Sequence, residues 1–207
     1  IRDSTMTQYA FHFNSDVCTG CKTCQVACKE TYKLPVNNLY RKVYNYQGGS
    51  WKPTEAGHYV PEGVFGYFVS LACNHCTNPA CVANCPTGAM QKDEETGIVW
   101  TDHDVCIGCK TCISACPYGA PSYDEASSTT FKCDGCYDRR QRGELPACVA
   151  ACPGANLALD DMESLQGAHA ADIVSDESSG TKPNFVITVD AALAEEPDDI
   201  VAENHTA

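Results

Sequence analysis

Residues 104–117 read DVCIGCKTCISACP, and residues 16–28 carry a near copy, DVCTGCKTCQVAC. Ten of the thirteen aligned positions are identical. A second pair of stretches is also repeated, PACVANCP at 79–86 and PACVAACP at 146–153. Two interleaved repeats of this kind indicate that one structural unit has been duplicated within the chain of 207 residues.

The 16 cysteines lie within or beside these repeats, in four groups of four with none left over. The first and third groups have the spacing C-x2-C-x2-C-x3-C. The second and fourth begin with C-x2-C and end, after a longer gap, with C-x3-C-P. In chain order the groups are Cys18, Cys21, Cys24 and Cys28; Cys73, Cys76, Cys81 and Cys85; Cys106, Cys109, Cys112 and Cys116; and Cys133, Cys136, Cys148 and Cys152.

This spacing is typical of bacterial ferredoxins, in which three cysteines of a run hold one [4Fe-4S] cluster and the fourth binds the neighbouring cluster. Gly20 and Gly108 lie between the first two cysteines of their groups, where the loop must bend sharply. Four such clusters need all 16 thiolates that the sequence supplies. Zinc favours two C-x2-C pairs per site and explains these runs poorly, and a disulfide framework is typical of shorter secreted chains.

Only 20 residues separate Cys85 from Cys106, so groups two and three are expected to form a compact inner module. Groups one and four must then pair across it, each lending its last cysteine to the other. The predicted fold is α+β and loop-rich, with duplicated two-cluster ferredoxin-like modules. We expect an outer module at 1–55 with 131–160, an inner module at 56–130, and an acidic C-terminal extension at 161–207.

The acidic residues are concentrated towards the C-terminal end. Residues 1–156 contain 15 acidic and 13 basic side chains, whereas residues 157–207 contain 12 acidic side chains and one basic one, Lys182. A nucleic-acid partner is not expected, because the phosphate backbone selects a basic surface. We interpret the acidic end as a solvated, partly disordered segment, with a docking surface for a partner subunit as the alternative.

The longest apolar run, GVFGYFVSLAC at 63–73, is far shorter than the roughly 20 residues that span a bilayer. Its aromatic and β-branched residues predict a buried strand that leads into the second cysteine group. The N-terminal IRDSTMTQYAFHF lacks the basic and apolar regions of a signal peptide. We therefore predict no direct membrane span, and any export would need a signal supplied by another protein.

A few other residues are candidates for a role beside the cysteines. Lys22 and Lys110 follow the second cysteine of their groups, where a cation would raise the potential of an anionic cluster; a surface lysine is the alternative. His75 is expected to be structural, since cysteines fill every ligand position. DRRQR at 138–142 is interpreted as a basic partner-binding patch or a solvated turn. No nucleophile–base pair, phosphate loop or carboxylate dyad stands out, so no catalytic residue is predicted.

Four stretches resemble the iron–sulfur subunit, the B subunit, of anaerobic dimethyl sulfoxide reductase and related electron-transfer subunits of molybdopterin oxidoreductases. They are CTGCKTCQVACKE (18–30), LACNHCTNPACVANCPTGAM (71–90), DVCIGCKTCISACPYGAP (104–121) and KCDGCYDRR (132–140). The resemblance extends to TKPNFVI (181–187), which cluster binding does not require and which favours this family over a generic polyferredoxin. PGANLALDD after Cys152 departs from the more usual family pattern Pro-Leu-Arg-Ala-Leu-Asp-Phe-Gly.

The resemblance implies how the cysteines are shared among four [4Fe-4S] clusters. Each cluster takes three ligands from one group and the fourth from another. In the family, the first cluster lies nearest the molybdenum subunit and the last nearest the membrane or quinol side. The implied sets are Cys18, Cys21, Cys24 and Cys152; Cys133, Cys136, Cys148 and Cys28; Cys73, Cys76, Cys81 and Cys116; and Cys106, Cys109, Cys112 and Cys85.

The resemblance also implies a function and partners. The chain would be a non-catalytic subunit that relays electrons between a quinol or other redox partner and a large molybdopterin catalytic subunit. A membrane quinol-oxidising anchor is a further implied partner, and the folded complex would be exported and held at the outer face of the membrane. A cytoplasmic location, a free-standing polyferredoxin and a zinc-stabilised module are the alternatives.

Overall fold

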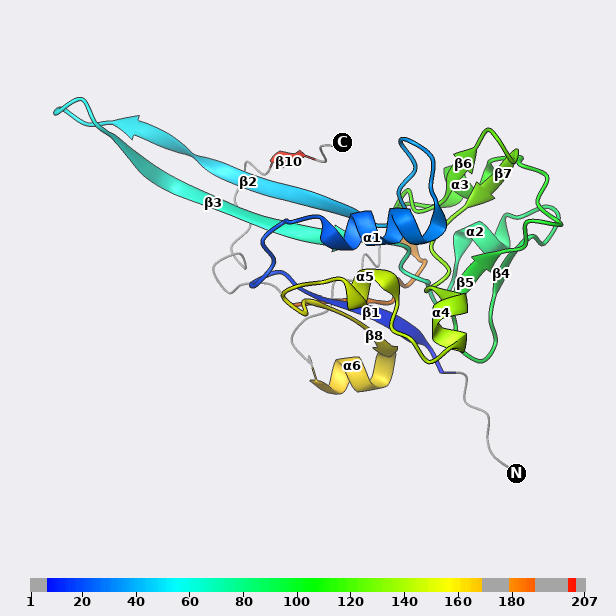
Figure 1. The fold of residues 1–207 in the computed structure, drawn as a ribbon. Helices are drawn as coiled ribbons and strands as arrows, with labels where there is room; N and C mark the ends of the chain where they lie inside the picture. The colour runs from blue at the N-terminus through cyan, green and yellow to red at the C-terminus, as the bar shows by residue number, and fades with distance from the viewer. Residues whose placement is uncertain (1–6, 169–178, 189–200, 204–207) are drawn as a thin grey trace.

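The computed structural model describes residues 7–168, 179–188 and 201–203. Its central sheet has three strands, in which β1 (Tyr9–Asn14) lies between β8 (Leu157–Asp161) and β9 (Phe185–Thr188). β8 runs antiparallel to β1, and β9 runs parallel to it. The first strand of the chain thus lies between two strands from its C-terminal part, of which Figure 1 labels β8 beside β1.

The two faces of β1 pack against different layers, because successive side chains of a strand point in opposite directions. Phe11 and Phe13 belong to the largest hydrophobic cluster, which also contains several of the cysteines. On the other face, Ala10 packs with Leu165 of α6 (Met162–Ala168) and with Val186 of β9. β1 therefore lies between the cysteine-rich core and the layer formed by α6.

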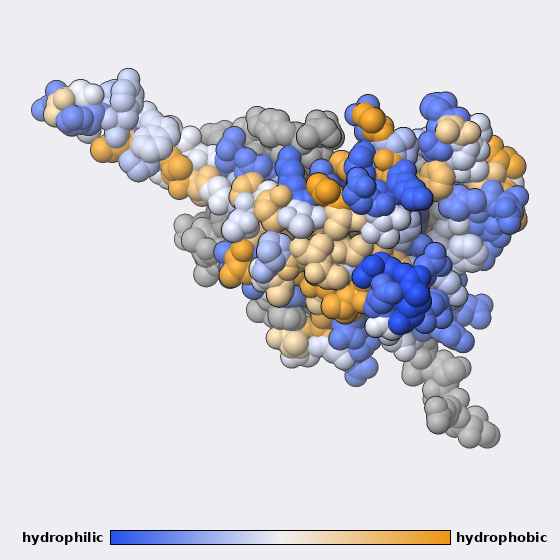
Figure 2. All heavy atoms as spheres, viewed as in Figure 1, coloured by the Kyte–Doolittle hydropathy of each residue, from blue (hydrophilic) through white to orange (hydrophobic). Residues whose placement is uncertain are grey.

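A long hairpin projects from the body (Figure 1) and consists of β2 (Lys42–Pro53) and β3 (Tyr59–Leu71). Its tip is hydrophilic, and apolar residues lie along one side of its stem (Figure 2). The strand predicted within 63–73 is present, but its predicted burial is wrong: between residues 63 and 71 only Val69 and Ser70 are buried. The outer part of β3 is paired with β2, and no second layer of the described residues covers it, so its apolar side chains stay exposed. At its base, β2 also pairs with β10 (Val201–Glu203).

The helices are short and follow the cysteine loops. α1 packs against α5, and α2 packs against α3. Two small two-stranded ladders complete the body, β4 with β5 and β6 with β7. The bounds are α1 Thr23–Tyr32, α2 Ala80–Ala83, α3 Thr111–Ala115, α4 Tyr137–Gln141, α5 Ala147–Ala150, β4 Met90–Lys92, β5 Val99–Thr101, β6 Ser122–Asp124 and β7 Thr129–Phe131.

The mixture of short helices, short strands and long loops agrees with the predicted α+β class. The outer and inner modules remain predictions, as does their duplication. In the predicted acidic extension, α6 and β9 pack against β1, whereas residues 169–178, 189–200 and 204–207 lie outside the described residues. Among the described helices, none has the length and apolar character that crossing a bilayer requires.

The loop of the third cysteine group leaves no room for a side chain at Gly108. We expect Gly108→Ala to lower the midpoint of thermal unfolding more than Gly119→Ala does. Both positions have a positive φ, so either alanine is strained by roughly 1–2 kcal/mol. Of these two positions, only at 108 would the new Cβ also clash with a backbone atom, the Ser128 carbonyl oxygen, which adds about 1–3 kcal/mol. Circular dichroism melts under anaerobic conditions measure the difference, and equal midpoints would contradict this close approach.

Candidate metal centres

The structure brings cysteines from different groups together around shared cavities. In each of three cavities, three thiols come from one group and a fourth comes from another. We name these sets after the order in which their clusters are expected. Quartet one is Cys18, Cys21, Cys24 and Cys152; quartet three is Cys73, Cys76, Cys81 and Cys116; quartet four is Cys85, Cys106, Cys109 and Cys112.

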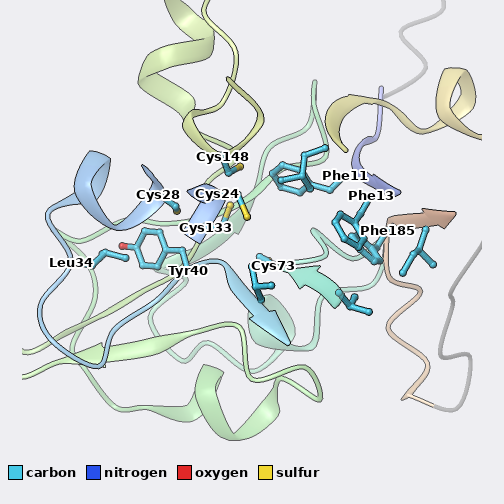
Figure 3. Close-up of a cluster of buried hydrophobic side chains, with 14 residues drawn as sticks. Phe11, Phe13, Cys24, Cys28, Leu34, Tyr40, Cys73, Cys133, Cys148 and Phe185 are labelled. Carbon is cyan, nitrogen blue, oxygen red and sulfur yellow. The ribbon is translucent and has the colours of Figure 1, made fainter. Parts of the chain in front are cut away.

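The remaining four cysteines form quartet two, which is Cys28, Cys133, Cys136 and Cys148. All four are buried. Three of them belong to the largest hydrophobic cluster and lie together at the centre of Figure 3. Cys28 and Cys148 belong to one buried cluster, on the helices α1 and α5 that pack together, so thiols from the first and fourth groups are neighbours. Burial raises the pKa of Cys28, and the charges of Cys148 and Cys136 raise it further.

Helical turns explain why adjacent cysteines serve different quartets. Cys24 and Cys28 are four residues apart on α1, so they are separated by about 6 Å along the helix axis. Cys24 nevertheless belongs to quartet one and Cys28 to quartet two. Cys148 and Cys152 repeat this arrangement in the opposite direction on and beyond α5. Two helices therefore each span the gap between quartets one and two.

Hydrogen-bond donors surround the sulfur atoms. Backbone N–H groups donate to Cys152 from Asn156 at 3.3 Å, and to Cys85 from Met90 at 3.4 Å. The same contact is made to Cys133 by Gly135 and to Cys136 by Ala147, both at 3.4 Å. Hydroxyl groups lie near three further sulfurs, in the pairs Cys21–Thr23, Cys109–Thr111 and Cys24–Ser70. Donors of this kind stabilise thiolate sulfur and tune the redox potential of an iron–sulfur group.

Burial divides the inner thiols from the outer ones. Burial raises the pKa of Cys133 well above its ordinary value, and it raises the pKa values of Cys76 and Cys81 to about 11 and about 12. In quartets one and four, hydrogen bonds from threonine hydroxyls lower the pKa of Cys21 and of Cys109, both of which are exposed. Because metal ligation requires thiolates, the buried thiols need a cationic group beside them to ionise near neutral pH.

The donor set fits iron–sulfur clusters. Across the described part of the chain, no three His, Cys, Asp or Glu side chains lie close enough together to hold one metal ion. The thiols of quartets one, three and four instead surround a cavity, with four sulfur donors around each. Four thiolates around a shared space are the ligands that a [4Fe-4S] cluster takes. When bound, such clusters supply one-electron redox chemistry.

The residues singled out beside the cysteines take varied positions. Lys22 and Lys110 both adopt left-handed conformations immediately before a helix, and Lys110 lies over the Tyr123 ring and near Glu125 at 3.9 Å. His75 is completely buried and accepts a hydrogen bond from the Val99 N–H at 3.0 Å. Burial lowers its pKa well below the ordinary value, so the ring is neutral.

The DRRQR stretch at 138–142 lies largely on α4 and not in a turn. Arg139 and Arg142 both form ion pairs with Glu144, at 3.1 and 2.7 Å. The Arg140 Nε donates to the Gly135 carbonyl at 2.9 Å, within the loop of quartet two. The arginines of this stretch thus have internal partners, which leaves less of the basic patch for another protein.

The TKPNFVI segment lies against the loop of quartet three. The N–H groups of Thr77 and Asn78 donate to the carbonyls of Lys182 and Thr181 at 2.8 and 2.9 Å. The Asn184 side-chain amide donates to the His75 carbonyl at 2.8 Å. This segment contains no cysteine, but its hydrogen bonds hold the backbone between the cysteines of quartet three in place.

Sequence reasoning missed three residues with polar groups near the thiols, of which two are buried and one, Tyr32, is partly buried. Arg41 and Lys132 are buried cations, and Lys132 lines the cavity of quartet three while it donates to the carbonyls of Val99 and Cys133. Tyr32 on α1 donates to Asp134, which also accepts the Cys136 N–H at 2.8 Å. Each is a single residue without a repeated spacing, so no sequence pattern indicates it.

Comparisons with known proteins match iron–sulfur domains to the parts of the chain that contain the cysteines. A 4Fe-4S dicluster domain matches residues 64–162, and a 4Fe-4S binding domain matches residues 15–37. The B subunit of anaerobic dimethyl sulfoxide reductase from Escherichia coli is 45% identical over 188 residues, which cover 89% of this chain and 90% of the relative. This protein belongs to the family of anaerobic dimethyl sulfoxide reductase B subunits. The family resemblance predicted from the motifs is thus confirmed.

Other members of the wider group show the same extent of similarity along the sequence. The dimethyl sulfoxide reductase B subunit of Haemophilus influenzae is 42% identical, and the match covers 88% of this chain and 89% of the relative. The polysulfide reductase B subunit of Wolinella succinogenes is 35% identical, with 87% of this chain and 93% of the relative covered. As a member of this family, the protein is an iron–sulfur subunit of the reductase type.

The Tyr32–Asp134 contact joins the helix of the first group to the loop of the fourth. We expect Tyr32→Phe to lower the free energy of unfolding by about 1–3 kcal/mol, because the partly buried Asp134 carboxylate loses a donor. Tyr59→Phe is the matched control, since Tyr59 is exposed near the hairpin tip. Anaerobic guanidinium unfolding compares the two variants. Similar small losses in both would mean that Tyr32 does not hold this loop.

Proposed function

We propose that this chain carries four [4Fe-4S] clusters and relays single electrons between a quinol or other redox partner and a molybdopterin catalytic subunit of a dimethyl sulfoxide reductase-type enzyme. The observation that carries the proposal is the crossed composition of the quartets. Each takes three thiols from one cysteine group and one from another, as two-cluster ferredoxin modules require. A set of four separate zinc sites would not need this sharing.

The quartets succeed one another in a row, which supports the relay. Quartets one and two are linked by α1, which carries Cys24 and Cys28. Quartets two and three are neighbours through Cys133 and Cys73, since both residues belong to the same buried cluster. Quartets three and four are linked by α3, because Cys112 lies on this helix and Cys116 directly follows it.

The two ends of the row are the places where electrons would enter and leave. Quartets one and four each contain an exposed cysteine, Cys21 and Cys109. Exposed apolar residues flank them, among which are Val17 beside Cys18 and Ile107 beside Cys106. We propose that the end at quartet one meets the catalytic subunit and that the end at quartet four meets the quinol side, as the family resemblance implies.

The partners follow from the family and not from the described residues alone. A large molybdopterin subunit would receive or supply the electrons, and an integral membrane subunit would anchor the complex and oxidise quinol. The complex would be exported in folded form and held at the outer face of the membrane. No substrate chemistry is assigned to this chain. The alternative is a free-standing polyferredoxin with the same clusters and no fixed catalytic partner.

Iron content tests the cofactor part of this proposal. Anaerobically purified protein should be brown and contain about 16 iron atoms and as many acid-labile sulfides per chain, since each cubane holds four of each. Metal analysis and visible absorption measure this. Stoichiometric zinc without visible absorption would refute the proposal. Purification from native extract tests the partner, because a chain that runs alone at its own mass would favour the free polyferredoxin.

Cysteine substitutions test the crossed arrangement. We expect Cys28→Ser and Cys148→Ser to alter the same component of the EPR spectrum, because both residues belong to quartet two. Cys18→Ser should alter a different component, although Cys18 and Cys28 are in the same sequence group. An EPR-monitored redox titration resolves the components. If Cys28→Ser changes the component that Cys18→Ser changes, the crossed scheme is wrong.

A further inference from the structure

Arg41 is a charged side chain in the middle of the cysteine core. It immediately precedes β2 and is only 1% exposed. Its guanidinium carbon lies 4.5 Å from the centre of the Phe11 ring, so one face of the group is covered by β1. A guanidinium stays protonated even when buried, and burying its charge is costly unless an anion is close by.

The hydrogen bonds of Arg41 do not account for its charge. The Nη1 atom donates to the Ser70 carbonyl at 3.0 Å and to the Ser70 hydroxyl at 3.2 Å. The Nε and Nη2 atoms are buried and have no hydrogen-bond partner within the described part of the chain. The ion pairs found among the described residues do not include Arg41. No carboxylate in this part of the chain therefore balances the guanidinium.

The cysteines around Arg41 come from two quartets, because Cys24, Cys28, Cys133 and Cys148 lie in the same buried cluster as Phe11, whose ring covers the guanidinium. Burial by itself would lower the pKa of Arg41, but the charges of Cys148, Cys133, Cys24 and Cys28 outweigh burial and raise it overall. In the opposite direction, Arg41 lowers the pKa values of Cys24 and Cys28, whereas their burial raises them. Cys24 belongs to quartet one, and the other three belong to quartet two.

Ser70 connects the guanidinium to one of these sulfurs directly. Its hydroxyl oxygen accepts from Arg41 and lies 3.4 Å from the Cys24 sulfur, with Ser70 and Cys24 both buried. A ligating thiolate can only accept, so the Ser70 hydroxyl hydrogen must point to Cys24. The guanidinium polarises the Ser70 hydroxyl, and this strengthens the hydrogen bond from the hydroxyl to the Cys24 sulfur of quartet one.

We propose that Arg41 is a positioning residue shared by quartets one and two, whose fixed positive charge raises the reduction potentials of the clusters that these two quartets would hold. The inference rests on the proposed function. Uptake of one electron from the redox partner adds one negative charge to a bound cluster, and a cation at fixed distance stabilises this reduced form more than the oxidised one. The charge of Arg41 would thus make the transfer of an electron from quartet four towards quartet one more favourable than it would be without this charge.

Variants that separate charge from packing test this role. Arg41→Met keeps most of the volume and removes the charge, whereas Arg41→Lys keeps the charge. Lys52→Gln is the control for a lost surface charge, because Lys52 forms an exposed ion pair with Glu62 on the hairpin. Ser70→Ala removes the hydroxyl contact to Cys24 but leaves the guanidinium in place. All four variants are titrated as the complete protein, with EPR detection of each component.

In Arg41→Met, we expect two of the four components to become at least tenfold harder to reduce, which is about 59 mV for one electron. These should be the components that the Cys18→Ser and Cys28→Ser variants alter. Ser70→Ala should shift only the component that Cys18→Ser alters. Arg41→Lys and Lys52→Gln should change the reduction equilibrium of each of the four components by less than threefold.

Iron and sulfide contents separate the possible failures. Unchanged potentials in an Arg41→Met protein with its full iron content would overturn the role of Arg41 and leave the proposed function intact. Equal shifts in Arg41→Met and Arg41→Lys would show that packing matters and charge does not, which also overturns it. Should Arg41→Met not retain iron, Arg41→Gln takes its place, because its amide can still donate to the Ser70 carbonyl. Absence of iron from the unaltered protein would refute the proposed function itself.

Discussion

The structure depends on the position of the last cysteine of each group, which one helical turn moves away from the other three. The third and fourth cysteines are four residues apart, and the turn between them carries the fourth sulfur about 6 Å along the helix axis. On α1, Cys24 therefore lies in quartet one, and Cys28, one turn later, lies in quartet two. No group can then complete its own set, so the loops must interlock. The packing of α1 on α5 and of α2 on α3 is the direct result.

Because the loops interlock, cysteines of the candidate metal centres are also part of the hydrophobic core. The largest hydrophobic cluster contains Cys24, Cys28, Cys73, Cys133 and Cys148 beside ordinary apolar residues. Their sulfur atoms have to ionise to bind metal, although burial opposes ionisation. The free energy of metal binding therefore contributes directly to folding. A chain that lost its metal would keep the sheet of β1, β8 and β9 but would lose the ligand bonds that join its cysteine groups.

The sequence was sufficient to predict the family and the mixed fold class, because the spacing of cysteine ligands reports loop geometry directly. It was insufficient for the hairpin: GVFGYFVSLAC has the composition of a core strand, and nothing local reveals that, among the described residues, burial of β3 is confined to the end near Val69. Arg41 was missed for a related reason. An arginine is usually exposed, and its burial depends on the coincidence of β1, β3 and α1, which no local pattern encodes.

The TKPNFVI segment shows how distant parts of the chain depend on one another. β9 pairs with β1, while the residues just before it hydrogen-bond the loop of quartet three. β1 in turn covers Arg41 through Phe11, and Arg41 faces quartets one and two. A single sheet thus links the environments of three quartets. If Arg41 sets the potentials as proposed, a change that shifts β9 along β1 would disturb both the bracing of quartet three and the charge beside quartets one and two. The segment that ends in β9 is therefore part of the electron-transfer core, although it contributes no cysteine to it.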